Sequence, residues 1–231
     1  MKKKYQTGIS LIEIMISLLI GAFLLGGVLQ IFIGSKQTYR MQENLTRLQE
    51  NGRLALELIG RDIRMTGYWG CMTPVTGDVY GEIIGGNSVI NLKSAFETTP
   101  IGTCGEPVDI NATYYTDNTS TINYSVNNFV LRKNTNDLIE GVDKLLIFYG
   151  VDIPDPVSLI NNGANFYVPA HDVVDWKQVV SIRVSLLVRS LEDNISTQPL
   201  AYIFNGVKTT PNDRRLRRVF TGTFAIRSRL P

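Results

Sequence analysis

The stretch Gly8-Ile9-Ser10-Leu11-Ile12-Glu13 decides the fold of this chain, because it places a carboxylate at the start of a long apolar run. Three lysines, Lys2 to Lys4, precede the stretch. The 22 residues from Ile14 to Ser35 carry no charge, and about 20 apolar residues suffice for a helix to span a bilayer. A charge at the centre of a membrane helix costs roughly 2.5–3.5 kcal/mol, so an intramembrane acid indicates a function and needs a partner.

An amine is the candidate partner of Glu13. If the chain is cut after Gly8, Ile9 carries a new α-amino group and Glu13 becomes the fifth residue, one helical turn away. The helix dipole favours a negative charge in the first turn by about 0.3–1 kcal/mol. The carboxylate can then pair with its own amine or with that of a neighbouring chain. Pairing with a neighbour would make Glu13 set the register of an assembly.

This segment resembles the class III signal of type IV pilins and pseudopilins. The shared features are a basic leader, a glycine, an apolar residue, Ser or Thr, Leu, Ile and Glu. The chain departs from the family at Ile9, where Phe is usual. The resemblance implies a leader of residues 1–8, cleavage by a prepilin peptidase after Gly8, and N-methylation of Ile9.

Two simpler interpretations of the apolar run are an ordinary secretory signal and a plain single-pass anchor. A secretory signal has a small-residue cleavage site after 7–15 apolar residues, whereas this run continues through Val28–Ile33. A plain anchor leaves Glu13 unexplained. The lysines before the run place the N-terminus in the cytoplasm by the positive-inside rule. The bulk of the chain is then exported, and the resemblance to pilins implies a bacterial inner-membrane protein with a periplasmic domain that later reaches the cell surface in a pilus.

The helical pattern continues beyond the apolar run. Apolar or small residues recur at steps of three and four, namely Leu45, Leu48, Gly52, Leu56, Ile59 and Ile63. Charged residues occupy the other faces, namely Arg40, Glu43, Arg47, Glu50, Arg53, Glu57 and Arg61. The pattern predicts one helix from about residue 9 to residue 64, transmembrane over 9–35 and amphipathic over 36–66.

Residues 67–231 are expected to form one exported β-rich domain. The segment 72–121 is rich in loop residues, with short apolar pieces at 82–84 and 88–90. Stronger strand candidates are 122–132, 138–151, 179–190, 200–204 and 216–228. Strands without intervening helical patterns indicate an antiparallel sheet with the helix on one face. The predicted class is α+β, a long helix packed on an antiparallel sheet, as in pilins.

The chain has two cysteines, Cys71 and Cys104, which is a number typical of one disulfide rather than of a set of metal ligands. In an oxidising periplasm such a pair predicts a disulfide, which would contribute on the order of 3–4 kcal/mol by restricting the unfolded chain. Two free buried thiols are the alternative.

The net charge of the whole chain is +2, and three positive charges belong to the leader. The mature chain is therefore nearly neutral, and nothing in its charge demands nucleic acid.

Residues with catalytic or metal-binding chemistry are scarce, and we expect no metal site, no cofactor and no small-molecule substrate. His171 is the only histidine. Calcium is an alternative through the loop acids Asp152, Asp155, Asp172 and Asp175, although their spacing is not that of an EF-hand. A nucleic-acid patch is an alternative for the basic cluster Arg214, Arg215, Arg217 and Arg218. Such a cluster without interleaved aromatic residues is more typical of a solvated hairpin or a subunit contact.

The segment Leu48–Cys71 looks like the helix-to-domain junction of minor pilins of the PilW type. Leu145–Asp152, Val180–Arg189 and Arg214–Phe220, with Arg227 near the end, support this resemblance. It implies a non-enzymatic subunit of the complex that initiates type IV pilus assembly, at or near the fibre tip. Its partners would be other minor pilins, the major pilin and the prepilin peptidase.

Three other functions stay open from the sequence. The first is a minor pseudopilin of a type II secretion system, which shares the leader and the helix-on-sheet domain. The second is a tip-displayed adhesin or DNA-uptake subunit. The third is an exported enzyme on a membrane anchor, for which the sequence offers no site.

Overall fold

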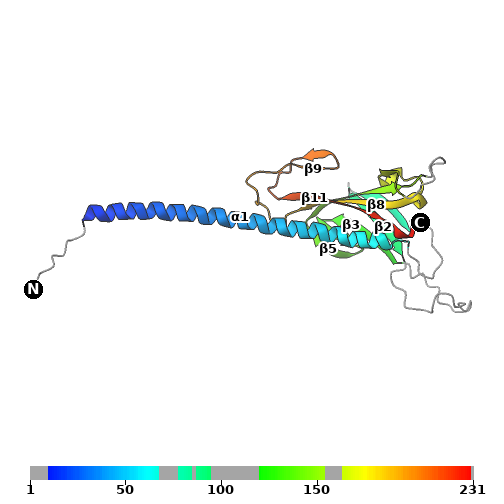
Figure 1. Cartoon of the computed structure of the whole chain (residues 1–231), viewed down its shortest axis with the longest axis horizontal. Coiled ribbons are helices and arrows are strands. Elements are labelled where there is room, and N and C mark those ends of the chain that lie inside the picture. Colours follow the sequence, from blue (N-terminus) through cyan, green and yellow to red (C-terminus); the bar gives the residue numbers. More distant parts are fainter. Residues whose placement is uncertain (1–9, 68–77, 85–86, 95–119, 154–162, 230–231) are drawn as a thin grey trace, which may run out of the picture.

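One long helix extends from a β-rich domain (Figure 1). The computed structural model describes residues 10–67, 78–84, 87–94, 120–153 and 163–229. Within them, α1 spans Leu11–Met65, and its 55 residues form a rod about 80 Å long. The other described elements are antiparallel strands and short 3-10 turns. This architecture confirms the predicted α+β class and the packing of one helix on antiparallel sheets.

The two halves of α1 have different surroundings. The large apolar side chains from Leu11 to Ile33 are all exposed, Phe23 to 77 %. In the described part of the chain, α1 is the one helix long and apolar enough to cross a membrane. The second half packs on the domain and ends at Met65; Thr66 is the C-cap, and Gly67 follows with a positive φ of +71° that favours glycine. The buried positions are Asn44, Leu48, Gly52, Ala55, Ile59, Gly60, Asp62 and Ile63.

The predicted apolar stripe of α1 is therefore correct in part. Leu48, Gly52, Ile59 and Ile63 are buried as expected. Leu45 is 38 % exposed, because the domain contacts this turn of the helix through Asn44 and Leu48 instead. Leu56 is half-buried against the core. The buried face is thus shifted toward small and polar residues that a hydrophobic pattern does not mark.

A four-stranded antiparallel sheet lies beside α1, in the order β11-β8-β6-β7. Its strands are β6 (Val142–Val151), β7 (Phe166–Val168), β8 (Val179–Arg189) and β11 (Arg217–Ala225). The 3-10 turns are η1 (Ala170–Asp172) and η2 (Trp176–Gln178) between β7 and β8, and η3 (Arg227–Arg229) after β11. The predicted strands 179–190 and 216–228 match β8 and β11 closely, whereas β7 was not predicted.

A five-stranded antiparallel sheet follows the chain order β1-β2-β3-β4-β5. Its strands are β1 (Val79–Ile84), β2 (Asn87–Ser94), β3 (Ser120–Asn127), β4 (Val130–Lys133) and β5 (Asn136–Glu140). The predicted strand 122–132 is a hairpin, because Asn128 and Phe129 both take positive φ and form a two-residue turn. The predicted strand 138–151 breaks at Gly141, whose φ is +83°.

The two sheets share one core around β6. Leu145, Ile147 and Tyr149 of β6 are buried together with Ile90 and Leu92 of β2. Polar side chains of β2 also accept hydrogen bonds from backbone amides of β6. Ser88 Oγ accepts a hydrogen bond from the Ile147 amide at 3.0 Å, and Asn87 Oδ1 accepts one from the Leu145 amide at 3.0 Å. The β-domain is therefore one body, against which the second half of α1 rests.

Between β8 and β11 the chain leaves the sheet, and we call residues 190–216 the excursion. It contains the hairpin of β9 (Tyr202–Phe204) and β10 (Val207–Thr209), joined by Asn205 and Gly206, which both have positive φ. In Figure 1 the chain around β9 lies at the end of the domain nearest the exposed half of α1. The predicted strand 200–204 is confirmed in shortened form as β9.

Glycines on α1 receive phenylalanines of β11. A Cβ at Gly52 would collide with the ring of Phe220, and a Cβ at Gly60 would collide with the ring of Phe224. Between these two contacts, Leu56 lies over Gly222 of β11. A phenylalanine of the strand thus faces each of the two helix glycines, and a leucine of the helix faces the strand glycine. This arrangement allows close packing.

Several predicted residues lie outside the described part of the chain, namely Gly8, Ile9, Cys71, Cys104 and Asp155. Cleavage after Gly8, methylation of Ile9 and the Cys71–Cys104 disulfide therefore stay predictions.

Candidate assembly surface on the exposed helix

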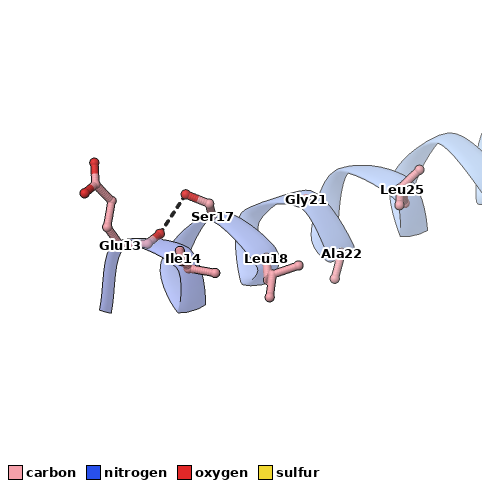
Figure 2. Close-up of a pocket in the computed structure, with 7 residues that line it drawn as sticks. All are labelled: Glu13, Ile14, Ser17, Leu18, Gly21, Ala22 and Leu25. Carbon is pink, nitrogen blue, oxygen red and sulfur yellow. Dashed lines mark hydrogen bonds between the residues drawn. The ribbon is translucent and has the colours of Figure 1, made fainter. Parts of the chain in front are cut away.

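Glu13 lies in the first turn of α1, where its carboxylate points away from the helix (Figure 2). Ser10 is the N-cap, and its carbonyl accepts a hydrogen bond from the Glu13 amide at 3.0 Å. The residue is exposed, so no side chain of its own domain covers the carboxylate. The position matches the predicted one, where the helix dipole stabilises a negative charge.

Small residues follow Glu13 along one side of the helix. Ser17 and Gly21 lie one and two turns further on, and Ser17 Oγ donates a hydrogen bond to the Glu13 carbonyl at 2.7 Å (Figure 2). Together with Ile14, Leu18, Ala22 and Leu25, they line a shallow groove beside the helix. Small residues let helix backbones approach closely in lipid or in a helical bundle. This surface offers a close helix contact with a carboxylate at one end.

Asp62 anchors the far end of α1 to the five-stranded sheet. Its side chain is 3 % exposed, and Oδ2 accepts hydrogen bonds from Tyr124 Oη at 2.6 Å and Lys133 Nζ at 2.7 Å. Burial and the adjacent Asp62 carboxylate raise the pKa of Tyr124 well above its usual value. Hydrogen bonds to a charged group each contribute about 1.5–3 kcal/mol. The contact therefore holds the helix in a fixed position on the domain.

A second buried ion-pair cluster links β6, β8 and β11. Asp143 lies 2.6 Å from Arg217 Nε and 3.2 Å from Arg189 Nε. Asp213 holds the same Arg217 through two hydrogen bonds of 2.6 and 2.7 Å. These bonds to Arg217 lower the pKa of Asp213 from 3.8 to about 2. Arg189 also stacks on Phe129, with its guanidinium carbon 3.5 Å from the ring centre, and so supports that residue's left-handed backbone.

The predicted basic cluster is mostly engaged inside the domain. Arg217 is buried in the ion pairs above. Arg215 donates to the carbonyls of Ser190 and Leu191, and Arg214 donates to Asn194 Oδ1. Arg218 is exposed and lies near the ring of Phe220. The four arginines therefore do not form one continuous patch, and the geometry does not favour a nucleic-acid interface there.

The acids considered for calcium do not converge in the described residues. Asp175 accepts a hydrogen bond from the Lys177 amide at 2.9 Å and caps η2, and Asp172 lies 3.5 Å from exposed His171. The described part of the chain contains no group of three His, Cys, Asp or Glu side chains that could hold a metal ion. It therefore provides no support for the calcium alternative.

Sequence reasoning missed both buried charge clusters. Asp62 lies three residues after Ile59 and next to Ile63, so its place on the buried face was readable from the helical period. That signal identifies an acid that needs a partner, but it does not identify Tyr124 or Lys133. Asp143 gave no such signal, because it lies at a register shift in β6 that alternation does not reveal.

The chain is similar to two sequence families and to solved structures. Residues 114–228 match the family described as Type IV Pilus-assembly protein W, and residues 3–29 match the Prokaryotic N-terminal methylation motif. A type IV-like pilin from Thermus thermophilus is 14 % identical, with a TM-score of 0.49 over 80 % of this chain and 98 % of that chain. No curated protein matches the chain.

Proposed function

Because the chain belongs to the type IV pilins of the PilW type, we propose that it is a minor pilin that helps to initiate pilus assembly and lies at or near the fibre tip. In this proposal the protein is a non-enzymatic subunit. The observation that carries it is the exposed first half of α1, which presents Glu13 and a close-packing groove with nothing from its own domain against them.

Before assembly, the apolar half of α1 lies in the inner membrane with the β-domain in the periplasm. The uncharged run has the length of a bilayer core, and the lysines before it favour a cytoplasmic N-terminus. An unpaired Glu13 carboxylate is unfavourable in this state. The subunit therefore gains stability when a cation approaches that carboxylate.

During assembly, the exposed helices of several subunits pack together and Glu13 pairs with the terminal amine of a neighbour. Moving the apolar side chains from lipid into a helix bundle changes their free energy little, since both surroundings are apolar. The ion pair between Glu13 and the amine is then the interaction that favours the assembled state over the unassembled one. The β-domain, held on α1 by Asp62 and by the glycine and phenylalanine contacts, selects the neighbours.

Deletion of the protein from its host tests this function. Fibre numbers on the cell surface should fall strongly and return when the wild-type chain is supplied. Intact fibres with lost protein secretion would instead favour a type II pseudopilin. Intact fibres with lost adhesion or DNA uptake would favour a tip receptor. Purification of the native membrane complex should recover other minor pilins with this chain.

A further inference from the structure

One corner of the excursion contacts α1 at Arg40. Arg40 Nη2 of the helix and Glu192 Oε2 of the excursion are 2.8 Å apart. The neighbouring residues form one connected cluster, since the Arg214 amide donates to Asp193 Oδ1 at 2.9 Å and the Arg214 side chain donates to Asn194. We call residues 191–194 together with Arg214 and Arg215 the proximal corner.

The position of Arg40 sets the distance of this corner from the membrane. The uncharged run ends at Ser35, and Arg40 lies five residues further along the helix, or about 7.5 Å. The headgroup layer of a bilayer is about 5–8 Å thick on each side. α1 continues without a break from the exposed half into the domain (Figure 1). When α1 spans the membrane, the proximal corner therefore lies at the level of the lipid headgroups.

The side chains at this height suit an anionic interface. Tyr39 is 68 % exposed and Leu191 is 45 % exposed, and aromatic residues are typical of the interfacial layer. Lys36 and Arg214 are exposed, and neither they nor Arg215 lie within ion-pair distance of a carboxylate in the described part of the chain.

The acids of the excursion are occupied within the protein. Glu192 pairs with Arg40, and Asp213 pairs with Arg217. Asp193 accepts hydrogen bonds from the amides of Asn194 and Arg214, which lower its pKa. Arg214 and Arg215 hydrogen-bond to the Asn194 amide oxygen and to backbone carbonyls, and these neutral partners leave their positive charges available to an external anion.

We propose that the proximal corner binds the phosphate groups of anionic lipids and holds the β-domain against the membrane until the subunit enters a fibre. Arg214 of the corner and Lys36 on the adjacent turn of α1 contact phosphates. Leu191 of the corner and Tyr39 of α1 enter the headgroup layer. This proposal rests on the membrane topology of the proposed function. It assigns a role to Arg214, which the assembly mechanism does not use.

Tryptophan probes in the full-length chain test the position of the corner. Leu191→Trp and a control Val174→Trp, each in a background in which the native Trp69 and Trp176 are changed to Phe, are placed in vesicles that contain brominated lipids. Val174 is 99 % exposed and lies just before η2, at the opposite end of β8 from Leu191. Leu25→Trp reports insertion of α1 independently. The expected result is quenching of the probes at 191 and 25 and none at 174.

The two failures are distinguishable. Quenching at position 25 without quenching at position 191 overturns the lipid contact and leaves the anchored helix intact. No quenching at position 25 overturns the membrane topology and the lipid contact with it.

Hydrogen exchange tests the phosphate chemistry with the native side chains. Amides of residues 190–196 should exchange more slowly in phosphatidylcholine membranes that contain phosphatidylglycerol than in phosphatidylcholine alone. Arg214→Gln should reduce that protection about fivefold, the effect of one cation near an anionic surface. The matched control Lys177→Gln, exposed in η2, should leave it unchanged. Equal exchange in both lipids overturns the proposal. Protection that appears only when another pilin is added assigns the corner to a protein partner instead and also overturns it.

Discussion

The ring of Phe224 on β11 occupies the space that a side chain would need at Gly60 of α1. Phe220 fills the corresponding space at Gly52, and Leu56 lies over Gly222 between them. This interlocking fixes the rotation and the height of the helix on the sheet. It therefore also fixes which face of the exposed half lies on the same side as the β-domain, on which the proposed assembly depends.

Gly60→Ala should destabilise the β-domain. A new methyl group forces the Phe224 ring to move, and such overpacking costs about 1–3 kcal/mol, of which the higher helix propensity of Ala returns up to about 1 kcal/mol. The matched control is Gly34→Ala, where nothing lies within 4 Å. Thermal unfolding of the full chain in detergent should show a lower Tm for the first variant only. Equal Tm values would contradict the interlocking contact.

The sequence predicted the elements whose signals are local and missed those that depend on distant partners. The period of α1 and the alternation in β8 and β11 are properties of single segments, and they place these elements to within a few residues. The hairpin at Asn128 and Phe129 was missed because an aromatic residue at positive φ is rare, and here stacking by Arg189 supports it.

The candidate site divides in the same way. Glu13 was predicted because a charge in an apolar run is visible without a structure. The engagement of Arg217 with Asp143 was not, since it joins residues 74 positions apart. The position of the proximal corner also needed the structure, because the Arg40–Glu192 contact spans 152 positions.

Tyr124→Phe should lower the free energy of unfolding by about 1.5–3 kcal/mol, because the buried Asp62 carboxylate loses a hydrogen bond that water cannot replace. Tyr80→Phe, at an exposed side chain of β1, is the control and should change the free energy of unfolding by less than about 0.5 kcal/mol. Denaturant unfolding of the full chain in detergent measures both variants. A neutral effect at position 124 would show that Lys133 alone satisfies Asp62.

The ion pair of Asp213 predicts a specific pH dependence. Its pKa is depressed from 3.8 to about 2 in the folded protein, so the pair contributes stability above pH 3.8, and this contribution is lost as the pH falls toward 2. The Tm difference between the wild type and Asp213→Asn should therefore be largest above about pH 4 and should shrink toward pH 2. A difference that stays constant over this range would mean that the contribution is not electrostatic.

Processing should leave Ile9 as the mature N-terminus. Mass spectrometry of the protein from its native host should find a chain that begins at this residue and carries a methyl group on its amine. Gly8→Leu should leave the precursor in the membrane, whereas Gly21→Ala, in open space on α1, should be processed normally. An intact Met1 or a terminus near Ser35 would refute the class III signal.

Incorporation of a Glu13→Val variant into the native assembly tests the central claim most directly. Removal of the charge makes the isolated helix more stable in lipid, so membrane abundance and cleavage should equal those of the wild type. Ile12→Val is the control beside it. The account predicts that the Glu13→Val chain is present in the membrane but depleted from the initiating complex and from sheared fibres, while the control is recovered normally. Normal recovery of the Glu13→Val chain would contradict the account, because assembly would then proceed without the carboxylate.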